Sequence, residues 1–118
     1  MTDSQFRLCW QEAEKYNEAE AYVSGLALSS MWGEAPDDEI PAARLQQLAC
    51  IWQAAHTSIR AIRQAAGLTQ AAFGERFLIP RRTIEEWEAG RRTPPDYTRL
   101  LLMQAVGMFT PADFGTAR

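Results

Sequence analysis

The stretch from Gly67 to Gly90 constrains the fold most strongly, because it divides a helical sequence into two short segments with a short turn between them. Thr69 is suited to cap the first segment, in which apolar side chains recur at helical spacing up to Phe77. Residues 78–80 connect it to a second segment, which Gly90 ends with a left-handed cap. The spacing predicts two short helices that cross at a large angle.

The apolar residues of these two segments fall on one face of each predicted helix. Phe73 and Phe77 share a face of the first helix, and Ile84 and Trp87 share a face of the second. We expect these four side chains to form a core. Gly74 stands where the second helix has to approach closely, so a small residue is expected there.

The rest of the chain also favours helices, because Ala, Leu, Glu, Gln and Arg dominate and the alternation typical of strands is missing. The stretch 21–32 fits either a helix or an extended segment, and 42–66 fits one long helix or two that meet near residues 56–58. Two prolines, a glycine and several charges predict a solvated loop over 33–41. Further helices are expected over 3–16, 70–77, 81–89 and 96–106.

Charge is distributed unevenly along the chain. The formal net charge is −3, which by itself argues against a nucleic-acid partner. However, residues 1–58 carry nine acidic and three basic side chains, whereas residues 59–92 carry seven arginines and four glutamates. The part that holds the paired segments is therefore basic, and a nucleic-acid partner stays open for it.

Residues 59–106 resemble the helix-turn-helix of the phage repressor and Cro family, also called the XRE family. The resemblance implies an all-α fold, a repressor-like helix-turn-helix bundle, here with an N-terminal helical extension. The residues that carry it are Leu68-Thr69-Gln70, Gly74, Ile84, Trp87-Glu88, Gly90, Arg91-Arg92 and Pro94.

Two residues of the turn depart from the family pattern, which commonly has Gly where Leu78 stands and Ser where Pro80 stands. If the turn is standard, Leu78 needs an unusual backbone angle. Pro80 still suits the start of a helix, because its fixed φ is compatible with one and its missing N–H is not needed there.

The resemblance also implies roles for individual residues. The second helix of the motif would lie in the major groove, where its N-terminal residues contact base edges. The expected base contacts are Arg81, Arg82, Thr83 and Glu86, with Arg81 and Arg82 suited to guanine. Glu85 and Glu86 have alternative uses: they can repel misplaced DNA or pair with a neighbouring arginine. The expected phosphate contacts are Thr69, Gln70, Arg91, Arg92 and Thr93.

These roles predict a sequence-specific regulator of transcription that binds double-stranded DNA, as a repressor and homodimer on a palindromic operator. Residues 1–41 would form an acidic helical extension with a part in dimerisation, 42–107 a helical linker and the DNA-binding domain, and 108–118 a flexible tail. One alternative is the antitoxin of a toxin–antitoxin pair, with a protein partner. Another is an autorepressor of a phage or mobile-element operon, such as an anti-CRISPR-associated regulator.

Other classes of function lack the residues they need. With a single histidine, His56, and no phosphate loop or metal-ligand spacing, neither enzyme activity nor a cofactor or metal is expected. Cys9 and Cys50 are predicted to be small buried apolar residues rather than a disulfide. No segment has the length and hydropathy of a membrane span or the pattern of a signal peptide, so a cytoplasmic location is expected.

Overall fold

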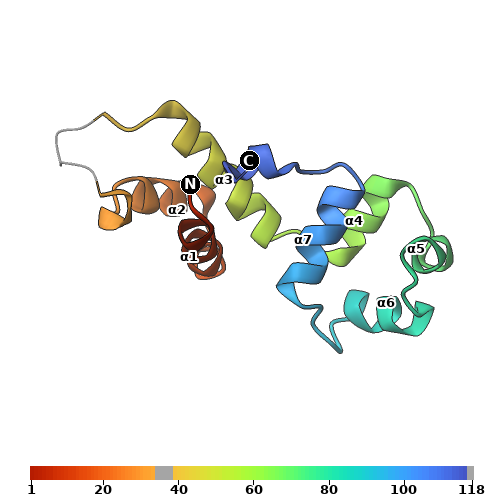
Figure 1. The fold of residues 1–118 in the computed structure, drawn as a ribbon. Coiled ribbons are helices and arrows are strands. Elements are labelled where there is room, and N and C mark those ends of the chain that lie inside the picture. The colour runs from red at the N-terminus through yellow and green to blue at the C-terminus, as the bar shows by residue number, and fades with distance from the viewer. Residues whose placement is uncertain (34–38, 117–118) are drawn as a thin grey trace. The chain divides into compact units, whose positions relative to one another are not determined.

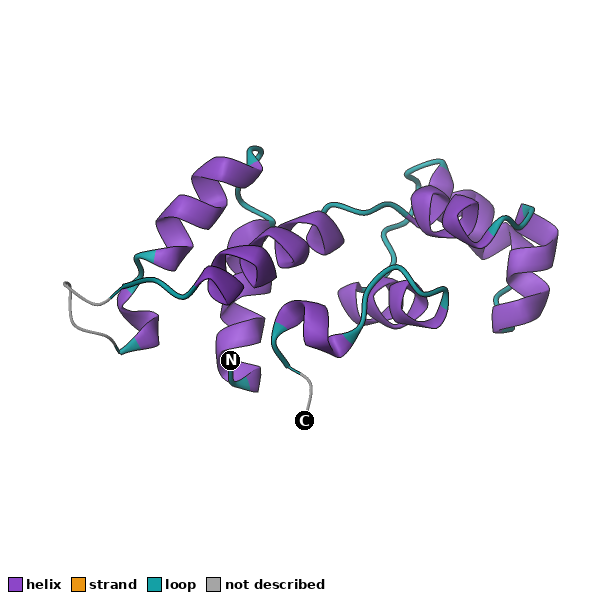
Figure 2. Cartoon of the chain, turned by 90° about the horizontal axis from the view of Figure 1, so that it is seen from above, coloured by secondary structure: helices purple, strands orange, loops and turns teal. Residues whose placement is uncertain are grey.

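The computed structural model describes residues 1–33 and 39–116, and every regular element among them is a helix, which confirms the all-α prediction (Figure 2). The chain divides into two compact units. Unit 1 comprises residues 1–56 and the segment from 109 onward, and unit 2 comprises residues 57–108. No helix within the described ranges is long and apolar enough to cross a bilayer.

The helices follow one another along the chain as labelled in Figure 1. Unit 1 holds α1 (Asp3–Ala13), α2 (Ala19–Ala27), the 3-10 helix η1 (Ser30–Trp32), α3 (Ala42–Ala55) and the 3-10 helix η2 (Pro111–Phe114). Unit 2 holds α4 (Ile59–Ala66), α5 (Gln70–Phe77), α6 (Arg81–Glu88) and α7 (Asp96–Ala105).

The structure decides two of the open alternatives. The stretch 42–66 is two helices, because the Ser58 hydroxyl accepts a hydrogen bond from the Ala61 amide and begins α4 anew. The stretch 21–32 is helical, although its helix already begins at Ala19. Residues 34–38 of the predicted loop over 33–41 lie outside the described residues.

The core of unit 1 lies between α1, α2 and α3. The Tyr22 hydroxyl is fully buried and donates to the carbonyl oxygen of Cys9 at 2.8 Å, so α2 is joined to α1 without an unpaired polar group. Burial raises the pKa of the Cys9 thiol to about 11, so it stays protonated at neutral pH. The other buried residues here are Trp10, Ala13, Leu26, Ala27, Leu48, Ile51, Ala54 and Ala55.

The C-terminal segment belongs to this core, contrary to the flexible tail predicted for 108–118. Helix η2 packs beside α3 (Figure 1), and Phe114 is only 1% exposed. The Phe114 ring lies 5.6 Å from Phe6 and 5.4 Å from Phe109, measured between centroids, and the Met1 ammonium donates to the Gly115 carbonyl at 2.8 Å. These contacts hold the segment although its sequence has no periodicity. Since α3 and η2 both pack in unit 1, its boundaries differ from those predicted at 41 and 107.

Unit 2 has its own core, with one or two apolar side chains from each helix. Phe73 and Ile84 are fully buried, as predicted, whereas Phe77 and Trp87 are half-buried. The Phe77 ring packs edge-on against Phe73, with centroids 4.9 Å apart. The remaining buried residues of unit 2 are Ile59, Ile62, Leu102 and Met103.

Candidate nucleic-acid interface

Helix α5 begins with a side-chain cap. The Thr69 hydroxyl accepts a hydrogen bond from the Ala72 amide at 3.1 Å, as its position in the sequence predicts. Gln70, the first residue of α5, is half-buried and hydrogen-bonds to Glu88 of α6. The structure therefore brings two of the expected phosphate contacts, Thr69 and Gln70, together at the positive end of the α5 dipole.

The turn between α5 and α6 confirms the close approach predicted at Gly74. A Cβ atom there would lie 2.6 Å from the Ile79 carbonyl oxygen and 3.2 Å from the Ile84 Cδ1 atom. Leu78 adopts φ 58° and ψ 39°, the left-handed conformation that a standard turn demands of this position. Its side chain is 90% exposed, so no packing compensates for the strain.

Because the strain at Leu78 is uncompensated, Leu78→Gly should raise the free energy of unfolding by about 0.5–1 kcal/mol, net of the extra chain entropy of glycine. Denaturant unfolding measures this change. Leu28→Gly is the matched control, since Leu28 is also exposed but has φ −94°, and it should destabilise the chain. A destabilised Leu78→Gly variant would show that the side chain has a contact worth more than the strain.

Helix α6 presents two arginines at its first two residues. Pro80 is its N-cap with φ −56°, so the helix starts where its sequence predicts. The side chains of Arg81 and Arg82 are 64% and 89% exposed. Each pairs with the glutamate one turn later: Arg81 Nε lies 3.1 Å from Glu85, and Arg82 Nε lies 3.1 Å from Glu86.

The structure places the other two expected base contacts differently. Thr83 is half-buried, and the Glu86 side chain is only 18% exposed. Hydrogen bonds from Arg92 and from Arg82 hold the pKa of Glu86 below its usual range. Of the alternatives for Glu86, the structure therefore shows the ion pair with a neighbouring arginine.

The segment after α6 turns back over the helix end. Gly90 has φ 76°, and the Arg91 amide donates to the Glu86 carbonyl at 2.9 Å, which forms a Schellman cap. This cap leaves Arg91, Arg92 and Thr93 exposed. The Arg92 Nη1 atom lies 3.3 Å from the second carboxylate oxygen of Glu86.

Comparison with known families agrees with this geometry. A family model described as helix-turn-helix matches residues 59–106. Residues 59–106 are a Cro/C1-type helix-turn-helix domain of the XRE family. No match was found among curated proteins or among solved structures. The helix-turn-helix domain makes the chain a DNA-binding transcriptional regulator, in a family that is typically non-enzymatic.

Within the helix-turn-helix domain, sequence reasoning missed the role of Glu88. Its side chain is 1% exposed and accepts two hydrogen bonds from Arg63, at 2.8 and 2.9 Å, and one from Arg60 at 3.1 Å. The hydrogen bonds from Arg63 dominate in holding the pKa of Glu88 below its usual range, and Gln70 adds another. Glu88 thus ties the end of α6 to α4 and to the first residue of α5. The spacing of Arg60 and Arg63 on one face of α4 is the signal that could have indicated a buried acidic partner.

Proposed function

We propose that the protein is a repressor that reads a specific DNA sequence with α6 in the major groove. The observation that carries this proposal is the exposed pair Arg81 and Arg82 at the first two residues of α6, where a recognition helix meets base edges. Arginine can donate two parallel hydrogen bonds to O6 and N7 of guanine, so each half-site should contain a guanine. A small protein seated there represses by excluding other proteins from the same DNA.

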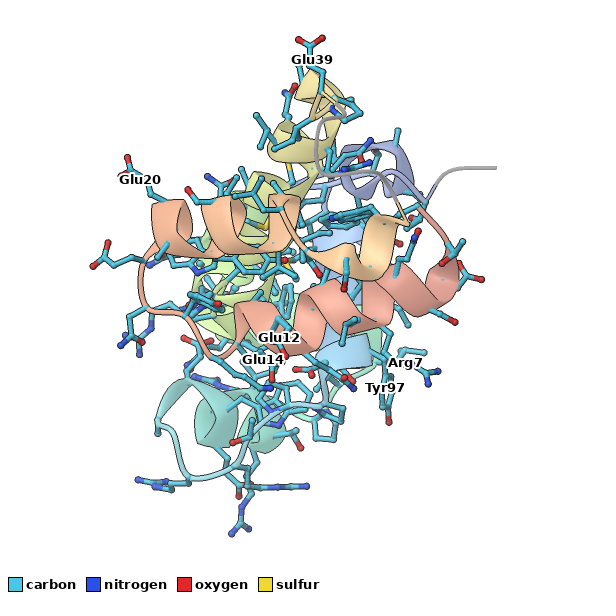
Figure 3. All side chains as sticks on the ribbon, turned by 90° about the vertical axis from the view of Figure 1, so that its left-hand side faces the viewer. Arg7, Glu12, Glu14, Glu20, Glu39 and Tyr97 are labelled. Atoms are coloured by element: carbon cyan, nitrogen blue, oxygen red, sulfur yellow. The ribbon has the colours of Figure 1, made fainter. Side chains whose placement is uncertain are left out.

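Phosphate contacts on both sides of the recognition helix would fix its register. Thr69 and Gln70 lie at the start of α5, and Arg91, Arg92 and Thr93 follow the end of α6, all outside the helix that reads the bases. Unit 1 is not expected to contact DNA. It carries most of the acidic side chains, and Glu20 and Glu39 point away from the ribbon into solvent in Figure 3.

The proposal includes a homodimer on a palindromic operator. A single helix-turn-helix module buries little DNA surface, so two copies on half-sites about one helical turn apart would supply the affinity. Large exposed apolar side chains suited to such contact occur in both units: Leu8 and Leu28 in unit 1, Tyr97 and Leu101 in unit 2. The assignment of dimer contacts to residues 1–41 stays a prediction. Light scattering with and without DNA tests it, and a monomer under both conditions would contradict it.

The decisive experiment is selection of bound duplexes from a random DNA pool, followed by variants of α6. Arg81→Ala or Arg82→Ala should weaken binding to the selected duplex by about 1–3 kcal/mol and relax the preference at one base pair. Arg91→Ala, the contrasting variant, should weaken binding evenly across sequences and reduce the salt slope by about one unit. If Arg81→Ala and Arg82→Ala both kept the original base preference, the placement of α6 would be wrong.

A further inference from the structure

Glu86 joins two arginines that the proposed function assigns to different tasks. One of its carboxylate oxygens lies 3.1 Å from Nε of Arg82, in the first turn of α6, and the other lies 3.3 Å from Nη1 of Arg92, beyond the end of the helix. Glu85, its neighbour, is 47% exposed and pairs with Arg81 alone. Glu86, at 18%, is the more enclosed of the two carboxylates.

The geometry of the Arg82 contact leaves the reading edge of the guanidinium open. Glu86 accepts from Nε, so the two terminal nitrogens of Arg82 keep their donors. Those two nitrogens form the fork that matches O6 and N7 of guanine. A long side chain held this way loses less rotamer freedom when it meets the base, because part of that loss has already occurred in the free protein.

The same carboxylate weakens attraction to DNA in general. Glu86 carries a negative charge next to two arginines on the surface that would face phosphates. A surface evolved for affinity alone would have no such charge, since non-specific binding comes almost wholly from attraction to the phosphate backbone. A carboxylate at this place costs affinity for every sequence, and the loss is recovered only where Arg82 finds its base.

We propose that Glu86 is a positioning residue that sets sequence specificity, by holding Arg82 for guanine and linking it to the phosphate-gripping Arg92. This inference rests on the proposed function. It predicts that removing the carboxylate strengthens binding to arbitrary DNA while it lowers the preference for the operator. A side chain that only stabilised α6 would change both affinities by the same factor.

The test compares Glu86→Gln with Glu75→Gln on a duplex selected from a random pool and on a shuffled duplex of equal length. Glu75 is an exposed residue of α5, so Glu75→Gln makes the same change of charge in the same domain. Glu75→Gln should raise affinity for both duplexes equally. Glu86→Gln should raise affinity for the shuffled duplex and lower the ratio of the two affinities about tenfold.

A second variant and a double-mutant cycle guard against other readings. Glu86→Ala should lower the ratio as far as Glu86→Gln, because neither side chain holds an arginine by charge. Adding Arg92→Ala to Glu86→Gln should lower the ratio less than the two single changes added together. Thermal unfolding checks that each variant is folded at the temperature of the measurement.

The outcomes separate this inference from the proposed function. If the wild-type protein selects a sequence and Glu86→Gln changes the ratio no more than Glu75→Gln, Glu86 is only a surface charge and the inference is wrong. If the wild-type protein binds the selected and shuffled duplexes equally, the proposed function itself is wrong, and the inference fails with it.

Discussion

Glu88→Ala is expected to lower the free energy of unfolding of the helix-turn-helix domain by about 2–4 kcal/mol. Removing one partner of a buried ion pair leaves the other charge uncompensated, at a cost of about 3–5 kcal/mol when both are buried. Here the carboxylate is enclosed, but the Arg63 side chain is 18% exposed and that of Arg60 is 58% exposed, which reduces the cost. Gln70 would also lose a hydrogen-bond partner.

The measurement is denaturant unfolding followed by amide hydrogen exchange in α4, α5 and α6. Glu75→Ala serves as control, because it removes an exposed glutamate from the same domain and should change the free energy of unfolding by less than about 0.5 kcal/mol. Equal effects of the two substitutions would mean that the contacts of Glu88 contribute nothing to stability.

The contribution of Glu88 should depend on pH. The pKa of Glu88 is lowered in the folded state, so its stabilisation is complete above the unfolded value, about 4.3, and is lost as the pH falls through the lower folded value. The stability difference between the wild-type protein and Glu88→Gln should therefore be constant near neutral pH and shrink below about pH 4.3. Glu86 is present in both proteins, so its own titration largely cancels from the difference.

Phe114→Ala should lower the free energy of unfolding of unit 1 by about 3–5 kcal/mol, the usual cost of emptying a buried aromatic site. The ring is 1% exposed and packs against Phe6 and Phe109. Amide exchange in α1, α2 and α3 should accelerate, while exchange in α5 and α6 should not, because Phe114 belongs to the other unit. DNA binding at low temperature should be retained.

Leu28→Ala is the control for this substitution, since Leu28 belongs to unit 1 but is 76% exposed. It should change stability by less than about 1 kcal/mol. If Phe114→Ala accelerated exchange in α5 and α6 as much as in α1, the two units would unfold as one, and the division of the chain at residues 56 and 109 would have no energetic meaning.

The sequence predicted the elements of unit 2 closely, because their ends are set locally. Ser58 and Thr69 cap the helices that follow them, and Gly67 and Gly90 adopt the left-handed conformation that ends a helix. Even the strained angle of Leu78 follows from the length of the turn alone. Such features depend only on neighbours within a few residues.

The predictions that failed or were missed depend on partners distant in sequence. Glu88 is buried because Arg63, 25 residues earlier, neutralises it. Phe114 is buried because Phe6 lies across the core of unit 1, although nothing in residues 108–118 has the period of a helix. The choice of Glu86 between a base and an arginine depends on Arg92, which lies beyond the helix end. Patterns within one segment cannot reveal such pairings.

The interrupted course of unit 1 has a consequence for synthesis. Chains emerge from the ribosome N-terminus first, and a domain folds once all its residues are out. The helix-turn-helix domain is continuous, so it can fold while Phe114 is still inside the ribosome, whereas α1, α2 and α3 must wait for that residue with their core incomplete. A nascent chain would therefore acquire its recognition helix before the part made first is stable.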